Sequence, residues 1–246
     1  MIVMPANSNK LVVGWLAGKY EGRVGHIYGP GGFRGPYSFL PFGLDNGRFP
    51  CWSEGREWDE SAFLGLLNRV MATGKRPLWV VVPDVVADRD ATLREWDSWA
   101  PRIEKYGWPL AMAVQDGMTP DDVPQEANVV FVGGSSDWKK ATLHDWTDEF
   151  ANVHVGRINS PKWLWECDRA GVKSCAGTGW FRGDKVQLAG LLFYFARKDQ
   201  GMGEPQQHLF PNQTHPYTCG CGNHVKPSYA KCPACNEPRP KMEDAQ

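Results

Sequence analysis

The sequence lacks any hydrophobic run long enough to cross a membrane. Its longest apolar stretch, LAGLLFYFA at 188–196, is far shorter than the about 20 residues that such a helix needs. The first ten residues, MIVMPANSNK, also lack the charged segment and apolar run of a secretory signal. We therefore expect a soluble, cytoplasmic protein with no membrane partner.

The sequence also has little net charge. Its 27 Lys and Arg residues are balanced by 28 Asp and Glu residues, which leaves a formal charge of −1. No overall positive field is available to attract nucleic acid, so any such contact has to come from a local patch. The candidate cations for a patch are Lys139, Lys140, Arg157, Lys162, Lys173, Arg182 and Lys185.

A dinucleotide-binding fingerprint is missing as well. No G-x-G-x-x-G follows a strand-like segment, which argues against a doubly wound sheet. From residue 77 onward, short β-branched runs alternate with longer amphipathic segments, as in βα units around a parallel sheet. This pattern favours the α/β class and a compact (β/α)8 TIM-like barrel over residues 1–198.

The alternation predicts the individual elements of this barrel. The expected strands are 78–82, 109–114, 128–132, 152–155 and 171–175, with earlier ones at 11–16 and 38–44. The expected helices are 60–73, 89–105, 136–149, 160–170 and 184–197. The expected helix N-caps are Asp59 or Ser61, Asp90, Ser135 or Ser136, and Ser160.

Cysteines are few and scattered until the C-terminal end. Cys51, Cys167 and Cys175 stand apart, whereas Cys219, Cys221, Cys232 and Cys235 form C-x-C and C-x-x-C pairs. Four such thiolates suit a structural zinc ion, and a segment this small has too little core to fold unaided. We expect a zinc-binding ribbon over 215–246 after a linker at 199–214, with His224 or His215 as possible substitutes for one cysteine.

Polar or glycine-rich steps follow the predicted strands. Asp84 follows 78–82, Gln115 follows 109–114, and Gly133 and Gly134 follow 128–132. Active sites of (β/α) barrels form where the strands end, so these groups describe a pocket able to hydrogen-bond a purine. Asp84 could instead cap the next helix, and Asp45, which lies in a glycine-flanked DNG step, could form an Asx turn.

Six short motifs in this order resemble the guanine transglycosylase superfamily, and within it the 7-deazaguanine DNA-modification transglycosylases of the DpdA type, found in bacteria and bacteriophages. The likeness spans about residues 38–195. The motifs are LDNGRF (44–49), Pro83-Asp84, AVQDG (113–117), FVGGSSDWK (131–139), HVGRINS (154–160) and GVKSCAGTGW (171–180).

The resemblance implies exchange of guanine in DNA for a 7-deazaguanine base such as preQ0. It assigns Asp45 to general acid/base work, Asp84 and Gln115 to the base edge, and Gly133 with Gly134 to backbone contacts. His154 and Arg157 belong to the motif of the DNA branch, with Arg157 a candidate phosphate contact and a salt-bridged rim arginine the alternative. A homo-oligomer or a partner subunit is possible, and a phage-encoded chain would work in the host cytoplasm.

The chain departs from the family at the nucleophile. The family has an aspartate just before Gly-Thr, and here the residue is Ala176, whose methyl group cannot attack C1′. Three explanations stay open: an engineered Asp→Ala change, a natural non-catalytic member, or a nucleophile elsewhere. The available carboxylates are Asp45, Asp84, Asp88 and Asp116, with Cys175 and Ser174 as poorer choices.

Three alternative functions follow. The chain could be a non-catalytic subunit that binds 7-deazaguanine or DNA, or it could exchange bases in tRNA. A metal-dependent barrel hydrolase is the third, although the strand ends offer no convincing cluster of His and Asp ligands.

Overall fold

The computed structural model describes residues 1–6, 10–31, 33–181, 185–205, 217–218 and 224–225. The chain divides into two units, Met1–Met202 and Gly203–Gln246. The second unit contains a short antiparallel pair, β9 (Tyr217–Thr218) with β10 (His224–Val225). The expected zinc ligands Cys219, Cys221, Cys232 and Cys235, and His215, lie outside the described residues. The zinc ribbon therefore stays a prediction.

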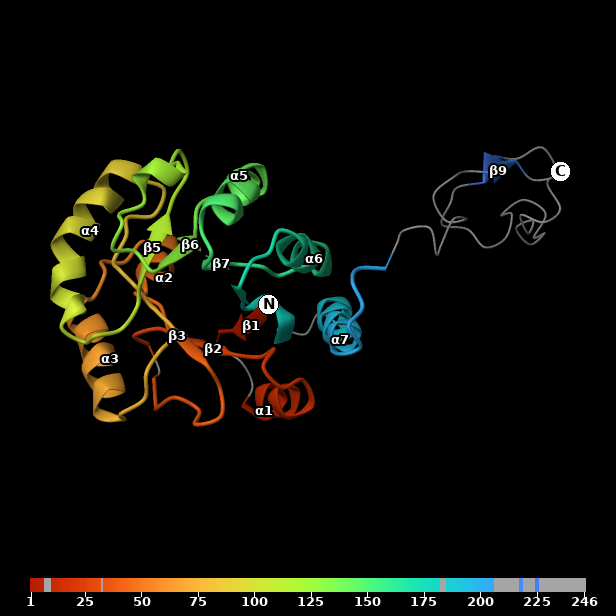
Figure 1. The fold of residues 1–246 in the computed structure, drawn as a ribbon, viewed down its shortest axis with the longest axis horizontal. Coiled ribbons are helices and arrows are strands. Elements are labelled where there is room, and N and C mark those ends of the chain that lie inside the picture. The colour runs from red at the N-terminus through yellow and green to blue at the C-terminus, as the bar shows by residue number, and fades with distance from the viewer. Residues whose placement is uncertain (7–9, 32, 182–184, 206–216, 219–223, 226–246) are drawn as a thin grey trace. The chain divides into compact units, whose positions relative to one another are not determined.

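The first unit is a nearly closed barrel of eight parallel strands, with helices around it (Figure 1). The strand order is β1-β8-β7-β6-β5-β4-β3-β2, and a bridge between Val3 and Val24 joins β1 to the segment before β2. The strands are β1 (Ile2–Pro5), β2 (His26–Tyr28), β3 (Phe42–Leu44), β4 (Val80–Val81), β5 (Leu110–Val114), β6 (Val129–Val132), β7 (Val153–Val155) and β8 (Ser174–Gly177). The predicted TIM-like barrel is confirmed.

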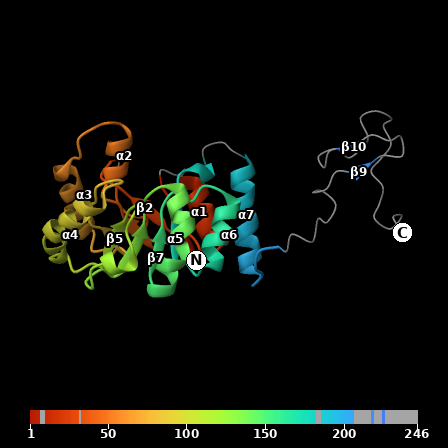
Figure 2. The same ribbon diagram turned by 90° about the horizontal axis from the view of Figure 1, so that it is seen from above.

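The helices do not fill every crossover of this barrel. They are α1 (Lys10–Lys19), α2 (Arg48–Ser53), α3 (Glu60–Ala72), α4 (Arg89–Glu104), α5 (Ser136–Glu149), α6 (Pro161–Arg169) and α7 (Lys185–Asp199). Figure 2 shows α2 at one end of the barrel, apart from the ring of longer helices. In the described residues, the β2–β3 crossover has no helix and the β5–β6 crossover has only a 3-10 turn, η1 (Pro120–Asp122). Within the part of the chain described, no helix is both long and apolar enough to cross a membrane.

The segment 11–16 is helical, and the predicted strand there is wrong. It lies within α1, where Val13 and Leu16 are buried while Leu11 and Trp15 are exposed. Burial at a spacing of three residues is helical, and the apolar run hid this because its outer face is apolar as well. The first two strands are instead β1 and β2, which the sequence analysis missed.

Most of the predicted helix starts are confirmed. The side chains of Asp59, Ser135 and Ser160 accept hydrogen bonds from backbone N–H groups in the first turns of α3, α5 and α6. The prediction of Asp90 for α4 is wrong, because Asp88 accepts the hydrogen bond from Ala91 N. Asp90 lies inside the first turn, where its charge favours the helix dipole.

Two hydrophobic cores are separated by the sheet. The larger one lies between the strands and the surrounding helices. The smaller one fills the barrel interior and consists of Met4, Ile27, Trp79, Val81, Ala111, Ala113 and Ala176. The Trp79 ring takes the space that a side chain at position 43 would need, since a Cβ on Gly43 would lie 2.4 Å from Trp79 Cη2. Trp79 therefore plugs the middle of the barrel.

Candidate functional site

The end of the barrel where the strands finish, here called the C-terminal mouth, is lined by the residues just after the strands. Asp84, which follows β4, is 7% exposed and accepts two amide hydrogen bonds. Asn46 Nδ2 donates to its Oδ1 at 2.7 Å, and Gln115 Nε2 donates to its Oδ2 at 2.7 Å. The mouth thus brings together the ends of β3, β4 and β5 around one buried carboxylate.

Further hydrogen bonds hold this carboxylate network in place. Asn46 Nδ2 also donates to Val82 O at 3.1 Å, and its Oδ1 accepts from Arg48 N. Gln115 Oε1 accepts from Ala87 N at 3.2 Å, where Ala87 has a left-handed φ of 61°. A non-glycine residue rarely adopts this conformation, so backbone strain is accepted here to fix the Gln115 amide.

The two acidic residues of this mouth have raised pKa values. The pKa of Asp84 is raised to about 6, mainly by burial and in smaller part by the negative charge of Asp45, whereas the hydrogen bond from Asn46 lowers it. Burial also raises the pKa of Asp45, whose Oδ1 accepts a hydrogen bond from Gly47 N at 2.7 Å. Paired carboxylates with raised pKa values are suited to moving protons near neutral pH.

The glycines after β6 are needed for local packing. A Cβ on Gly134 would lie 2.5 Å from Asp116 Oδ2 and 2.6 Å from the Trp138 ring, and Gly134 has φ 63°. A Cβ on Gly133 would lie 3.0 Å from Gln115 Nε2, and the Gly133 N–H already donates to Val114 O. The Gly133 N–H is therefore part of the sheet, and both glycines let neighbouring side chains approach.

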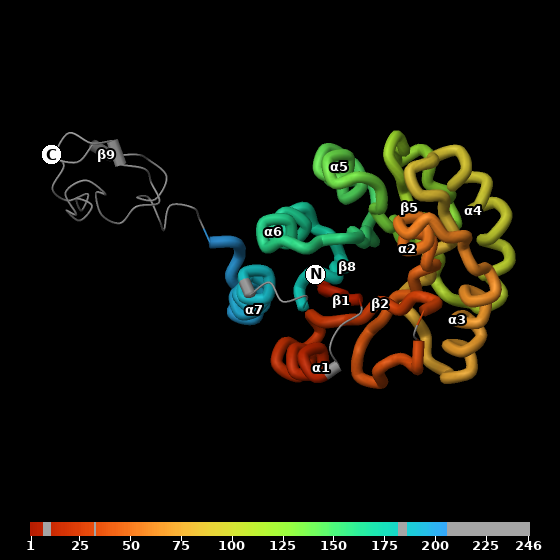
Figure 3. The backbone as a smooth tube through the Cα atoms, turned by 180° about the vertical axis from the view of Figure 1, so that it is seen from behind, coloured from red at the N-terminus to blue at the C-terminus, as the bar shows by residue number. Residues whose placement is uncertain are grey.

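Arg157 and α2 reach toward each other across the C-terminal mouth. The Arg157 guanidinium lies 4.6 Å from the centre of the Phe49 ring and donates to Gly134 O. In the strand order, β3 and β7 are four places apart in a barrel of eight, so this contact joins opposite sides. Figure 3 shows α2 in front of the strands when the barrel is seen from behind. Arg48 anchors α2 through an ion pair with Glu95 of α4 at 2.8 Å.

Arg157 also has strained backbone geometry, with φ 61°. Such strain persists where surrounding contacts impose it, and it is frequent at functional sites. Phe49 and Trp52 of α2 are 36% and 57% exposed, and their ring centres are 5.8 Å apart. The mouth therefore presents a cation and an aromatic pair above the carboxylates.

His154 does not lie at this mouth. Its ring is fully buried in the barrel, stacked on Phe131 at 4.7 Å and tilted against Trp79 at 4.7 Å. Its Nδ1 is 2.7 Å from Ser174 Oγ, and burial lowers its pKa to about 3, so the ring is neutral. A substrate at the strand ends would not reach this side chain.

Ala176 lies inside the barrel at the end of β8, packed in the smaller core, with Met4 as its register partner on β1. Among the substitute nucleophiles, Asp88 caps α4, and Asp116 accepts from Ser135 N and Oγ at 2.6 and 2.5 Å. Cys175 faces the outer core, where burial raises its pKa well above the usual value. Asp45 forms the expected Asx turn through the bond from Gly47 N, and Asp84 accepts from Asn46 and Gln115 while Asp88 caps α4. These two carboxylates remain as the acidic candidates of that group.

The predicted cationic patch is only partly at this mouth. Lys139 is buried, and its Nζ donates to Gly156 O at 2.7 Å. Burial lowers its pKa to about 8. Lys173 precedes β8 and therefore lies at the other end of the barrel. Arg182 lies outside the described residues.

The role of Asn46 at the C-terminal mouth and the helix α2 were not predicted from the sequence. Asn46 stands beside Asp45 in the LDNGRF motif, and its side chain, together with that of Gln115, holds Asp84. The signal was an amide directly after a predicted strand, the same signal that identified Gln115. In the part of the chain that the structure describes, no group of three or more His, Cys, Asp or Glu side chains could hold a metal ion.

Comparisons with known proteins show no family for this chain. No protein-family model matches the chain, and no curated protein matches it. A structure described as native KDPGal is 12% identical, with 81% of this chain and 82% of that chain covered and a TM-score of 0.39. Phosphoribosyl anthranilate isomerase from Thermococcus kodakaraensis is 14% identical, with 80% and 98% covered and a TM-score of 0.43. At these values the likenesses carry no argument about activity, and the resemblance to guanine transglycosylases rests on the sequence motifs.

Proposed function

We propose that the chain is a guanine transglycosylase for DNA that exchanges guanine for a 7-deazaguanine base such as preQ0, and that its C-terminal mouth binds the base. The observation that carries this proposal is the buried Asp84 carboxylate held between two amides. An ionised carboxylate has about four acceptor positions, so two remain after the bonds from Asn46 and Gln115. Guanine and 7-deazaguanine offer a matching pair of donors, N1–H and the exocyclic amine.

Asp45 fits the acid/base role in this proposal. Base exchange requires a proton for the leaving guanine and removal of a proton from the incoming base. The raised pKa of Asp45 lets the group hold a proton closer to neutral pH than a solvated aspartate does. In duplex DNA the target nucleotide has to leave the stack to reach this mouth.

Ala176 favours a second candidate function for this exact sequence. Its methyl group lies among apolar residues such as Met4 and Val81, so no carboxylate stands at the family's nucleophile position. A chain of this kind would bind 7-deazaguanine or DNA without exchanging the base, alone or as a subunit of an active assembly.

The first test measures base binding by calorimetry with guanine and preQ0. Asp84→Asn should weaken binding by about 10- to 100-fold, because one charge-assisted acceptor is lost. Asp97→Asn is the matched control, since Asp97 is an exposed aspartate on α4 away from the mouth. Equal affinity of both variants would contradict the role of Asp84.

The second test measures release of labelled guanine from DNA and from tRNA in the presence of preQ0. With Ala176 at the nucleophile position we expect little or no exchange, and we expect exchange on DNA by Ala176→Asp. Base binding without exchange by either protein would favour the binding subunit. Exchange on tRNA alone would assign the tRNA substrate, and absence of both binding and exchange would reject the proposal.

A further inference from the structure

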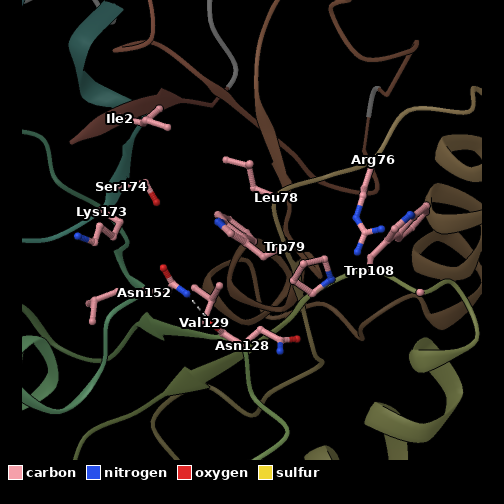
Figure 4. Close-up of a pocket in the computed structure, with 13 residues that line it drawn as sticks. Ile2, Arg76, Leu78, Trp79, Trp108, Asn128, Val129, Asn152, Lys173 and Ser174 are labelled. Carbon is pink, nitrogen blue, oxygen red and sulfur yellow. Dashed lines mark hydrogen bonds between the residues drawn. The ribbon is translucent and has the colours of Figure 1, made fainter.

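A cavity of about 470 Å³ lies at the opposite end of the barrel, here called the N-terminal mouth. Its walls come from the first residues of the strands and the segments before them, including Ile2, Trp79, Val129 and Ser174. Cavities of this size hold small organic ligands. Figure 4 shows Arg76 and Lys173 on opposite sides, with Leu78 and Trp79 between them.

The charge at this mouth has one sign. Arg76 and Lys173 are the charged residues among the 13 that line the cavity, and none of the 13 is Asp or Glu. Neither cation makes an ion pair with any residue that the structure describes. Two unpaired cations beside a cavity without acids favour an anionic ligand, and a guanidinium in particular matches the geometry of a phosphate.

The walls between the cations are apolar and aromatic. The largely buried rings of Trp79 and Trp108 line the cavity beside Leu78, which is 41% exposed. Ser174 adds a hydroxyl that is paired with His154 Nδ1, and Asn128 and Asn152 add amides. An apolar wall flanked by cations suits a ligand with a flat body and an anionic group.

The plug at the middle of the barrel separates this cavity from the C-terminal mouth. Trp79 lines the cavity and also packs into the space beside Gly43 and against the His154 ring. Asp45, Asp84 and Gln115 are absent from the residues that line the cavity. The two mouths are therefore distinct sites, and ligand binding at the N-terminal mouth is independent of the proposed base exchange.

We propose that the N-terminal mouth is a second binding site, which takes an organic anion with a planar body, in the class of nucleoside monophosphates. Arg76 binds the anionic group, because its guanidinium matches a phosphate, and Lys173 on the opposite side adds to the positive potential of the cavity. The wall at Trp79, Trp108 and Leu78 contacts the planar body. The amides of Asn128 and Asn152 supply polar contacts at the edge.

The test is calorimetry with AMP, adenosine and inorganic phosphate. AMP suits this purpose because adenine lacks the N1–H donor that Asp84 would bind. We expect AMP to bind at least about tenfold more tightly than adenosine or phosphate alone. Arg76→Ala should weaken AMP binding about tenfold and Lys173→Ala about two- to threefold. Lys75→Ala is the matched control, because Lys75 is the neighbouring exposed cation and is not among the residues that line the cavity.

A structural role for the same cations would give a different result. Arg76 and Lys173 follow the C-terminal ends of α3 and α6, where cations can stabilise the helix dipoles. A loss of that role lowers thermal stability without changing ligand binding. Thermal unfolding of each variant is therefore measured in parallel. Equal AMP affinity of Arg76→Ala, Lys173→Ala and Lys75→Ala, or no AMP binding at millimolar concentration, would overturn the proposal. Guanine binding in these variants reports separately on the C-terminal mouth.

Discussion

The two mouths of the barrel have opposite chemistry. The C-terminal mouth contains Asp45 and Asp84 with raised pKa values, and the contact between Phe49 and Arg157 spans it. The N-terminal mouth has cations, no lining carboxylate and an open cavity. One barrel of parallel strands therefore offers two unlike environments, because the residues that precede the strands and those that follow them lie at opposite ends of the barrel.

The separation of the two mouths depends on the Trp79 side chain, which fills the middle of the barrel. If Trp79 did not fill the interior, a ligand or water at one mouth would be in contact with groups at the other. Variants of Trp79, Asp84 and Phe49 test, in order of decreasing effect, the separation of the two mouths, the acidic C-terminal mouth and the contact between Phe49 and Arg157 that spans it.

Trp79→Ala should lower the free energy of unfolding by about 3–5 kcal/mol, because it removes a buried indole and leaves a cavity in the barrel. It should also weaken the separation of the mouths, so that AMP and guanine affect each other's binding. Urea denaturation and paired calorimetry measure the two effects. Trp52→Ala is the control, since Trp52 is 57% exposed and its loss should change stability little.

Guanine binding should depend on pH through Asp84. Its pKa is raised to about 6, so the ionised acceptor is present above that pH and is lost below it. Affinity should be constant from about pH 7 to 8 and fall about tenfold per pH unit below 6. Calorimetry between pH 4.5 and 8 checks this, and a flat profile for natural Asp84 would contradict the assignment.

The same pKa shift has a consequence for stability. Because the folded pKa of Asp84 lies above its unfolded value, its contribution is most favourable below the unfolded value and is lost as the pH rises through about 6. Asp84→Asn should remove this part of the pH dependence of unfolding. Urea denaturation of both proteins at several pH values measures the difference.

Phe49→Ala should have the smallest effect. A partly exposed cation–π contact contributes about 0.5–1 kcal/mol, so stability should change little, while guanine should enter the mouth faster. Stopped-flow binding measures the entry rate. Phe193→Ala is the matched control, because Phe193 is also exposed and lies 5.8 Å from the Arg197 guanidinium on α7. Equal rates in the two variants would show that the bridge does not limit access.

The later strands could be predicted and the first ones could not. β5 to β7 consist mostly of β-branched or apolar residues, and the helices that follow β6 and β7 have polar caps at their starts. At the N-terminal end, β1 and β2 are about as short as β7, but in the described residues no helix follows β2 before β3 to mark a βα repeat. The longest apolar run in that region belongs to α1, which is apolar on both faces.

The candidate site could be predicted in part for a similar reason. Asp84 and Gln115 follow well-defined strands, so the barrel rule places them at one mouth, and the structure brings them to 2.7 Å. His154 is different, because it belongs to the strand itself and alternation directs it into the interior. The contact between Arg157 and Phe49 joins residues more than 100 positions apart, and no local pattern encodes it.

The fit between Gly43 and Trp79 also limits how sequences with this fold can diverge. The Trp79 ring fills the space that a side chain at position 43 would need, so a larger residue at 43 requires a smaller residue at 79. Related chains should therefore show correlated changes at these two positions, although Gly43 lies on β3 and Trp79 directly precedes β4. A search for covariation between positions 43 and 79 would identify relatives from the packing of the barrel interior, whatever ligands their two mouths bind.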